Sequence, residues 1–174
     1  MDKDVIFIIA NEGYQPVEYA IPKKILEQAD FIVTTASDKP TLAVASDKST
    51  TKVDLTLNDI IIGDYAAIIF IGGPGTLDHL DNDISYALIK AANKKKLIIG
   101  AICVSPRILS NAGILKGKRV TGWDEDNKLG NIFKKAGATY VPENVIIDGH
   151  IITAIGPSAA EAFGDQLVTL LQKK

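Results

Sequence analysis

The single cysteine of the chain, Cys103, stands where a buried strand is expected to pass into a helix. The apolar run 97–102 ends directly at this residue. A turn without spare residues strains the backbone of its pivot and lifts the pivot side chain over the sheet. A helix N-terminus favours the thiolate, so we predict a reactive thiol with a lowered pKa. The competing interpretation is a cysteine buried as a small apolar side chain.

A glycine-rich turn, Gly72-Gly73-Pro74-Gly75, follows a second apolar run at 66–71. Such a turn can present backbone N–H groups to an anion. It is not a Walker loop, because no Gly-Lys-Ser/Thr follows. It is not a dinucleotide-binding fingerprint either, because Asp78 holds the third glycine position. The alternative is a tight turn with no chemical role.

Glu18 lies near the start of a helix expected over 16–29, on the same side of the fold. Pro22 has no N–H for the Glu18 carbonyl, which should bend this helix or loosen its first turn. Two anions in one crevice repel, so we expect Glu18 to keep its proton while the Cys103 sulfur carries the charge. The alternative is a glutamate that only favours the start of its helix.

Strand-like and helix-like segments alternate along the chain and must position these residues. Continuous β-branched runs between amphipathic helices are typical of a parallel sheet that is covered on both faces. Ligands of such sheets bind beyond the carboxyl ends of the strands, where 11–14, 72–75 and Cys103 fall. The expected strands are 5–10, 31–36, 66–71, 97–102 and 119–122, with hairpins over 41–45 and 50–53 and over 145–148 and 151–154. The expected helices are 16–29, 83–95, 104–112, 126–136 and 158–171.

Apolar spacing predicts which face of two of these helices is buried. For the helix over 16–29 the predicted face is Val17, Ala20, Ile21, Ile25 and Leu26. For the helix over 83–95 it is Ile84, Ala87, Leu88, Ala91 and Ala92, with Asn82 or Asp83 as the N-cap.

Length and composition limit the remaining choices. The 174 residues, 47% of them apolar, suit a single domain over 1–174. A net charge of −2 lacks the basic face of a nucleic-acid binder, and the apolar runs are too short to span a membrane. One cysteine excludes an internal disulfide and a multi-thiolate metal site, and His79 and His150 have no metal-site spacing. We therefore expect a cytoplasmic protein without metal or cofactor.

Four segments together resemble the ThiJ/PfpI superfamily, which is class I glutamine amidotransferase-like, over residues 5–171. They are Val17-Glu18-Tyr19-Ala20-Ile21-Pro22, Gly72-Gly73, Ala101-Ile102-Cys103-Val104-Ser105-Pro106 and Gly156-Pro157. The resemblance implies a flavodoxin-like three-layer sandwich with a mainly parallel central sheet and a nucleophile-elbow cysteine beside a protonated glutamate. It also implies a homodimer or a higher homo-oligomer.

The resemblance assigns roles to individual residues. Cys103 is the nucleophile, Glu18 its partner, and the backbone N–H groups of Gly73 and Val104 form the oxyanion hole. Other expected pocket residues are Gly72, Tyr14 at the edge, Trp123 as an apolar wall, Ser105 and Pro157. The peptidase branch has a histidine where this chain has Val104, and the branch linked to parkinsonism has one at Trp123, so we do not expect peptidase activity.

Family activities include peptidase, glyoxalase III, protein deglycase and isonitrile hydratase. We predict a cysteine-dependent enzyme that acts on a small-molecule substrate, either an electrophilic carbonyl or a glycated adduct. The alternatives are an oxidation-responsive stress protein or chaperone that uses Cys103 as a redox thiol, or an isonitrile hydratase. No nucleic-acid or membrane partner is expected.

Overall fold

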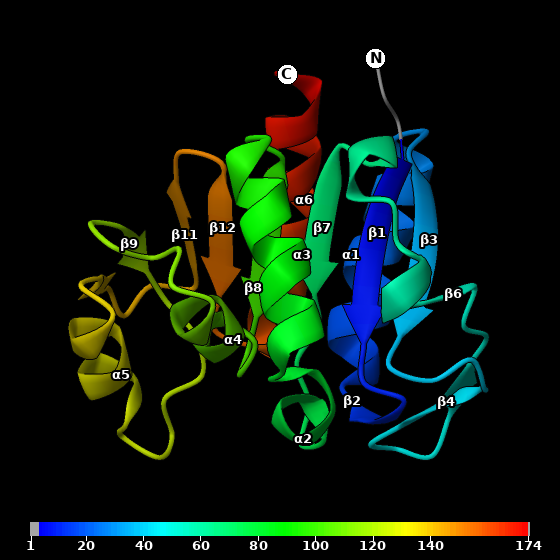
Figure 1. Cartoon of the computed structure of the whole chain (residues 1–174), viewed down its shortest axis with the longest axis horizontal. Helices are drawn as coiled ribbons and strands as arrows, with labels where there is room; N and C mark the ends of the chain where they lie inside the picture. Colours follow the sequence, from blue (N-terminus) through cyan, green and yellow to red (C-terminus); the bar gives the residue numbers. More distant parts are fainter. Residues whose placement is uncertain (1–3, 174) are drawn as a thin grey trace.

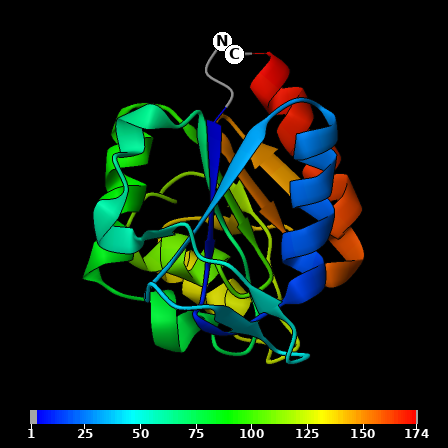
Figure 2. The same cartoon turned by 90° about the vertical axis from the view of Figure 1, so that its right-hand side faces the viewer.

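A computed structural model, which describes residues 4–173, shows three layers with a central sheet between helices (Figures 1 and 2). The main sheet has the strand order β11-β12-β8-β7-β1-β3-β6. Only the β11–β12 hairpin is antiparallel; the other neighbours in this sheet are parallel. The strands of this sheet are β1 Asp4–Ile9, β3 Ile32–Ser37, β6 Leu55–Thr56, β7 Ala67–Phe70, β8 Ile98–Ile102, β11 Val145–Asp148 and β12 Ile151–Ala154. The mainly parallel sheet predicted from the sequence is confirmed.

The three central strands are buried because both faces of the sheet are covered. Every residue of β7 and β8, and all of β1 after Asp4, is buried. Figure 2 shows α1 and α6 side by side on one face of the sheet and α3 on the other. The helices are α1 Pro16–Gln28, α2 Thr76–Leu80, α3 Asp83–Lys94, α4 Pro106–Asn111, α5 Leu129–Lys135 and α6 Ala160–Gln172. Short 3-10 turns are η1 Leu57–Asp59, η2 Ile62–Asp64 and η3 Pro157–Ala159.

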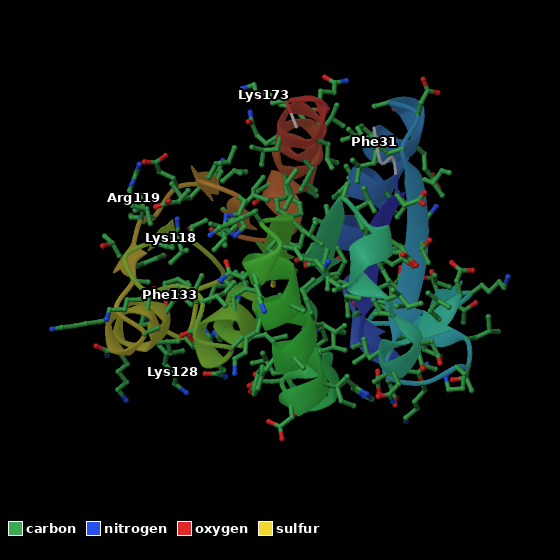
Figure 3. The ribbon with its side chains drawn as sticks, turned by 45° about the horizontal axis from the view of Figure 1, so that its top comes forward. Phe31, Lys118, Arg119, Lys128, Phe133 and Lys173 are labelled. Carbon is green, nitrogen blue, oxygen red and sulfur yellow. The ribbon has the colours of Figure 1, made fainter. Side chains whose placement is uncertain are left out.

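Two small sheets flank the main one. β2 Glu12–Tyr14 pairs with β4 Ala43–Ala45, which forms the predicted hairpin with β5 Thr50–Thr51. β9 Arg119–Val120 pairs with β10 Thr139–Tyr140. Figure 3, in which Phe133 of α5 and Arg119 of β9 are labelled, shows that this second sheet and α5 lie together at one side of the molecule. No helix within residues 4–173 is long and apolar enough to cross a membrane.

The predicted helix faces are correct at Ala92 of α3 and Leu26 of α1, and the buried faces are otherwise rotated to other residues. In α3 the buried residues are Ser85, Ile89 and Ala92, whereas Ile84 is 41% exposed. The Asn82 side chain accepts from the N–H groups of Ile84 and Ser85 and fixes where α3 begins. The small Ser85 and Ala92 side chains then face the sheet and let the helix lie close to it.

In α1 the buried residues are Glu18, Tyr19, Pro22 and Leu26, so only Leu26 of the predicted face is buried. Val17 and Ile21 are each 38% exposed. The neighbouring helix explains this rotation. A Cβ on Gly164 of α6 would lie 2.8 Å from Ile25 Cδ1 and 3.0 Å from Pro22 Cα, so α6 can approach α1 only because Gly164 has no side chain.

Three helices begin later than predicted, and the last of them, α6, starts at Ala160 rather than at residue 158, after the 3-10 turn η3. Residues 103–105 form a turn, and α4 starts at Pro106 rather than Val104. A proline needs no N–H partner at the first helical position, which explains why the helix begins there. α5 starts at Leu129 rather than Asp126, because the Asp124 carboxylate accepts from the Leu129 N–H at 2.7 Å.

Candidate functional site

Cys103 lies at the carboxyl end of β8 in a backbone conformation that side chains rarely adopt. Its φ angle is +64°, in the left-handed region that is costly for a residue with a Cβ. Two backbone hydrogen bonds hold it there: its N–H donates to the Ala154 carbonyl at 2.9 Å, and its carbonyl accepts from the Trp123 N–H at 2.8 Å. The thiol side chain is 8% exposed. The strained turn is therefore present, and the nucleophilic role of its cysteine stays a prediction.

The first turn of α1 places the Glu18 carboxyl against this cysteine. Glu18 is fully buried, and its Oε2 accepts from the Gly72 N–H at 3.0 Å. The Cys103 thiol lies close enough to the same carboxyl group for each to shift the pKa of the other. Its Oε1 has no hydrogen-bond partner. A buried carboxyl oxygen without a partner is costly, and active sites are where such a cost is found.

The two glycines after β7 make room for this pair. A Cβ on Gly72 would lie 2.5 Å from Cys103 Cβ and 2.6 Å from Glu18 Oε2, closer than atoms can approach. Gly73 has a φ of +131°. A Cβ at this position would lie 2.4 Å from the Gly13 carbonyl oxygen and 2.5 Å from the Gln15 backbone nitrogen. The backbone N–H groups of Gly73 and Val104 lie close enough to the Cys103 sulfur to lower its pKa. The structure thus brings together the four residues to which the sequence assigned the reaction.

Burial controls the charges of the pair. It raises the pKa of Glu18 to about 7, against the lowering effect of hydrogen bonds from Cys103 and Gly72. Burial and the neighbouring Glu18 carboxylate raise the pKa of Cys103 to about 12. The predicted raised pKa of Glu18 is confirmed in direction. The predicted lowered pKa of the thiol is wrong, and so is the expectation that the sulfur carries the charge beside a protonated Glu18. The six-residue α4 begins three residues beyond Cys103, and its dipole does not offset desolvation of the thiolate.

The pair therefore holds one proton and one negative charge between about pH 7 and pH 12, with the proton on the sulfur. An ionised Glu18 beside the protonated sulfur is the arrangement that a general base requires.

Cys103 and Glu18 open into a cavity of about 610 Å³. Of the residues predicted for the pocket, Gly73, Val104, Trp123 and Pro157 also line it. Ser105 lies beneath it: its hydroxyl is buried and donates to the Ile71 carbonyl at 2.9 Å, which ties the turn after Cys103 to the end of β7. Gly72 lies beneath it in the same way, as the donor to Glu18.

Tyr14 is the predicted pocket residue whose side chain lies in the hydrophobic core instead. It is 1% exposed, its hydroxyl hydrogen-bonds Thr51 at 2.7 Å, and its ring packs edge-on against Tyr19 at 5.6 Å. The expectation that Tyr14 edges the pocket is wrong, because the β2–β4 pairing turns its side chain into the core.

Sequence reasoning missed the arginine in the wall of the pocket. Arg107, Glu125 and Asp126 line it together with Gln15, Pro74 and Leu77. One signal was available: Arg107 is one of only two arginines in the chain and stands one helical turn beyond Cys103. Its partner could not be found in this way, because Asp126 is 19 residues further along the chain.

Neither histidine belongs to the pocket. His79 Nδ1 hydrogen-bonds Asp38 at 2.7 Å, and His79 lines a different hollow. His150 Nε2 hydrogen-bonds Asn93 at 2.8 Å. Within residues 4–173 no histidine lines the cavity above Cys103. The same part of the chain contains no group of three side chains that could hold a metal ion.

The fold has three layers, with a mainly parallel sheet between helices, and the cysteine lies at the carboxyl edge of that sheet. These features define a flavodoxin-like α/β protein with a candidate cysteine site. A sequence profile of the DJ-1/PfpI family matches residues 3–170, and the chain belongs to that family. An uncharacterized protein of Methanocaldococcus jannaschii is 32% identical over 170 residues, which are 97% of this chain and 82% of that protein. The putative cysteine protease YraA of Bacillus subtilis is 28% identical and covers 96% of this chain and 98% of its own.

Solved structures agree on the fold. The ThiJ/PfpI domain protein of Brachyspira murdochii superposes with a TM-score of 0.93 at 26% identity, over 99% of this chain and 98% of that one. DJ-1beta of Drosophila melanogaster superposes with a TM-score of 0.88 at 24% identity, over 100% and 92% of the two chains. Membership of the family supports a general role as a cysteine-based enzyme or a stress protein.

Proposed function

We propose that this protein is a cysteine-dependent enzyme that acts on small electrophilic carbonyls or glycated adducts, in the manner of a glyoxalase III or a deglycase. One observation carries the proposal: the Cys103 thiol lies beside the buried Glu18 carboxyl and close to the N–H groups of Gly73 and Val104. Nucleophile, base and oxyanion donors are thus within reach of one reacting atom.

The chemistry begins when the Cys103 sulfur adds to the carbonyl carbon of the substrate. Glu18 takes the thiol proton as the carbon–sulfur bond forms, and the oxygen that gains the electron pair is held by the Gly73 and Val104 N–H groups. Returning the proton to that oxygen gives a hemithioacetal. For a dicarbonyl, Glu18 can then take the C–H proton of the hemithioacetal carbon and deliver a proton to the neighbouring carbon, which turns the hemithioacetal into the thioester of a 2-hydroxy acid. Water adds to the thioester carbonyl, the carbon–sulfur bond breaks, and the hydroxy acid leaves as the thiol regains its proton.

The first prediction is that the purified protein converts methylglyoxal to lactate. Cys103→Ser should lower this turnover by at least about 10³-fold, because the hydroxyl is a far weaker nucleophile without a stronger base. Lactate formation measured enzymatically checks the result, with thermal unfolding to show that the variant is folded. Equal turnover by Cys103→Ser would rule out a reaction at this thiol.

Peptidase activity should be absent or trace. A cysteine peptidase needs a base that can also protonate a leaving amine, and no histidine lines the described pocket. Hydrolysis of casein and of short fluorogenic peptides is the measurement. Efficient cleavage that disappears in Cys103→Ala would show that Glu18 suffices as the acid and that this inference is mistaken.

A second candidate function is that of a redox thiol in a stress protein. It is favoured by the surroundings of the sulfur, where two N–H groups and a carboxyl could hold the oxygens of a sulfinate. Loss of one thiol per chain on peroxide treatment, without turnover of methylglyoxal or an isonitrile, would favour this role. Relatives in the DJ-1 family are typically homodimeric, and the exposed Val17 and Ile21 side chains on α1 support the proposal that this chain self-associates.

A further inference from the structure

Three side chains form a clamp beside the Cys103 pocket, which we call the Arg107 clamp: Arg107, Asp126 and Trp123. Arg107 Nη2 donates to Asp126 Oδ1 at 2.7 Å, and Nη1 donates to Asp126 Oδ2 at 3.0 Å. Nη2 also donates to the Trp123 carbonyl at 3.3 Å, and the guanidinium lies 5.4 Å from the centre of the Trp123 ring. A planar two-point pair that is also stacked on an aromatic ring is a contact that lysine cannot reproduce.

The clamp joins the turn after β8 to the segment that closes the pocket. Arg107 belongs to α4, which starts just after the cysteine turn, while Trp123 and Asp126 lie in the loop before α5. The Trp123 N–H also donates to the Cys103 carbonyl at 2.8 Å. The loop before α5 is therefore bonded both to Cys103, at the start of the turn after β8, and to Arg107, just beyond the turn. The Arg107 side chain is only 11% exposed, and its Nε is buried without a partner. A protein that needed only stability would gain by replacing such a group with an apolar one.

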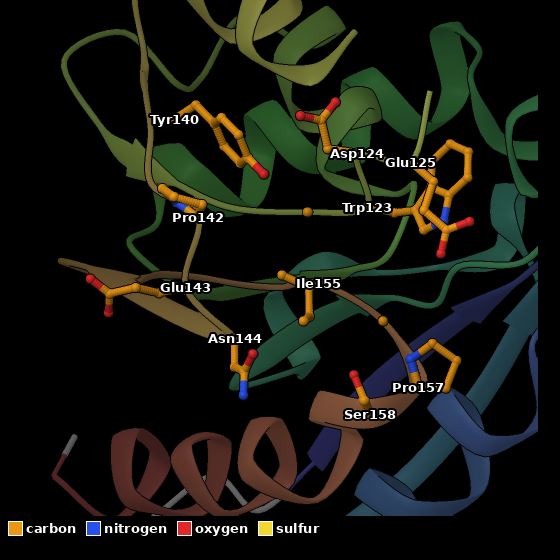
Figure 4. A pocket seen from close by; sticks show the side chains of 12 residues that line it. Trp123, Asp124, Glu125, Tyr140, Pro142, Glu143, Asn144, Ile155, Pro157 and Ser158 are labelled. Atoms are coloured by element: carbon orange, nitrogen blue, oxygen red, sulfur yellow. The ribbon is translucent and has the colours of Figure 1, made fainter. Parts of the chain in front are cut away.

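The clamped loop separates two cavities. A second cavity of about 410 Å³ adjoins the Cys103 pocket, and both are lined by Trp123, Glu125 and Pro157. Figure 4 shows these three residues at one end of the second cavity and Tyr140 and Pro142 at the other. Trp123 is therefore part of the wall between the two spaces, and its position decides how large a molecule can approach the sulfur.

We infer that Arg107 is a positioning residue that sets the size of the substrate: through Asp126 and Trp123 it fixes the wall of the Cys103 pocket, so that small free electrophiles reach the thiol and bulky adducts do not. This inference rests on the proposed function, because it narrows the substrate class from carbonyls and adducts in general to small free molecules. The rate at which a reagent reaches the sulfur can be measured without turnover, so the inference about Arg107 and the proposed function can fail separately.

The test compares two alkylating reagents that have the same reactive group and differ in size, iodoacetamide and iodoacetamidofluorescein. In both, the sulfur–carbon bond forms as iodide leaves and the thiol proton passes to solvent. Cys103 is the only thiol, so mass spectrometry of the whole chain gives both rates. Arg107→Met and Asp126→Asn should each raise the bulky-to-small rate ratio by about tenfold, because each loses the charge-assisted two-point contact that holds the loop.

Matched variants separate the clamp from general loosening. Arg107→Lys keeps the charge but loses the two-point contact, and it should behave like Arg107→Met. Arg119→Met removes the other arginine, on β9, and should leave the ratio unchanged. If Arg107→Met does not fold, Asp126→Asn at the more exposed end of the pair tests the same contact. An unchanged ratio, an equal rise for both reagents, or a wild-type ratio in Arg107→Lys would overturn the inference.

Discussion

Replacing Glu18 with glutamine is expected to lower turnover by at least about 10²-fold and to remove a break near pH 7 in the reactivity of Cys103. The pKa of Glu18 is raised to about 7, so the thiol of the native protein should react faster with rising pH until about pH 7 and then level off. Above that pH the carboxylate is fully formed and the pair loses no further proton until about pH 12. Glutamine cannot take a proton, so the thiol of the variant must ionise alone.

The measurement is the rate of Cys103 alkylation by iodoacetamide from about pH 5 to about pH 10. In Glu18→Gln the rate should rise past the ordinary thiol pKa of about 8.5, since burial still disfavours the thiolate. A break that stays near pH 7 in this variant would place the base elsewhere and remove Glu18 from the mechanism.

Stability supplies the control for the same variant. The pKa of Glu18 is higher in the folded protein, about 7, than its ordinary value of 4.5. The native state then binds the proton more tightly than the unfolded state, so stability falls as the pH rises from 4.5 to about 7 and stays low above it. Glu18→Gln avoids this cost and should be more stable than the native protein at about pH 8, by up to about 3 kcal/mol, and not at about pH 4. A stabilised, inactive variant distinguishes a catalytic loss from a folding defect.

The sequence was sufficient for the longer buried strands, because their burial on both faces leaves continuous apolar runs that glycines and polar turns interrupt. It did not predict the short strands β2, β6 and β10. β8 was expected at 97–102 and runs from Ile98 to Ile102. The carboxyl ends of β7 and β8 meet because the strands are parallel neighbours, which is why Gly72 and Cys103 could be placed together from their positions alone.

The rotation of the helices about their axes, and the depth at which individual side chains are buried, could not be predicted from the sequence in the same way. The face that α1 buries depends on its close approach to Gly164 of α6, more than a hundred residues later in the chain. The pKa of Cys103 depends on how far the thiol and the Glu18 carboxylate are removed from water. A local pattern, such as a helix after a cysteine, shows that the helix dipole lowers the thiol pKa. It does not show whether this lowering is larger or smaller than the rise caused by desolvation.

Replacing Gly72 with alanine is expected to disable the site and destabilise the protein together. The new methyl group would lie 2.5 Å from Cys103 Cβ, 2.6 Å from Glu18 Oε2 and 2.9 Å from the Ile102 carbonyl oxygen. Gly72 does not have a positive φ, so the backbone would accept alanine and the effect is purely steric. Overpacking of this kind costs about 1–3 kcal/mol, and the upper end applies because two of the opposing groups belong to the backbone or to a strained turn.

Urea unfolding of Gly72→Ala measures the loss of stability, and the pH dependence of Cys103 alkylation measures the damage to the pair. Gly130→Ala is the matched control: it lies within α5, where the added Cβ meets only Tyr140 Cδ1 at 3.8 Å, an ordinary contact. Alanine in a helix interior should stabilise the protein there by about 0.5–1 kcal/mol and leave the thiol untouched. If Gly72→Ala matches this control in both measurements, Cys103 and Glu18 are not held as closely as the geometry requires, and a proton cannot pass directly between them.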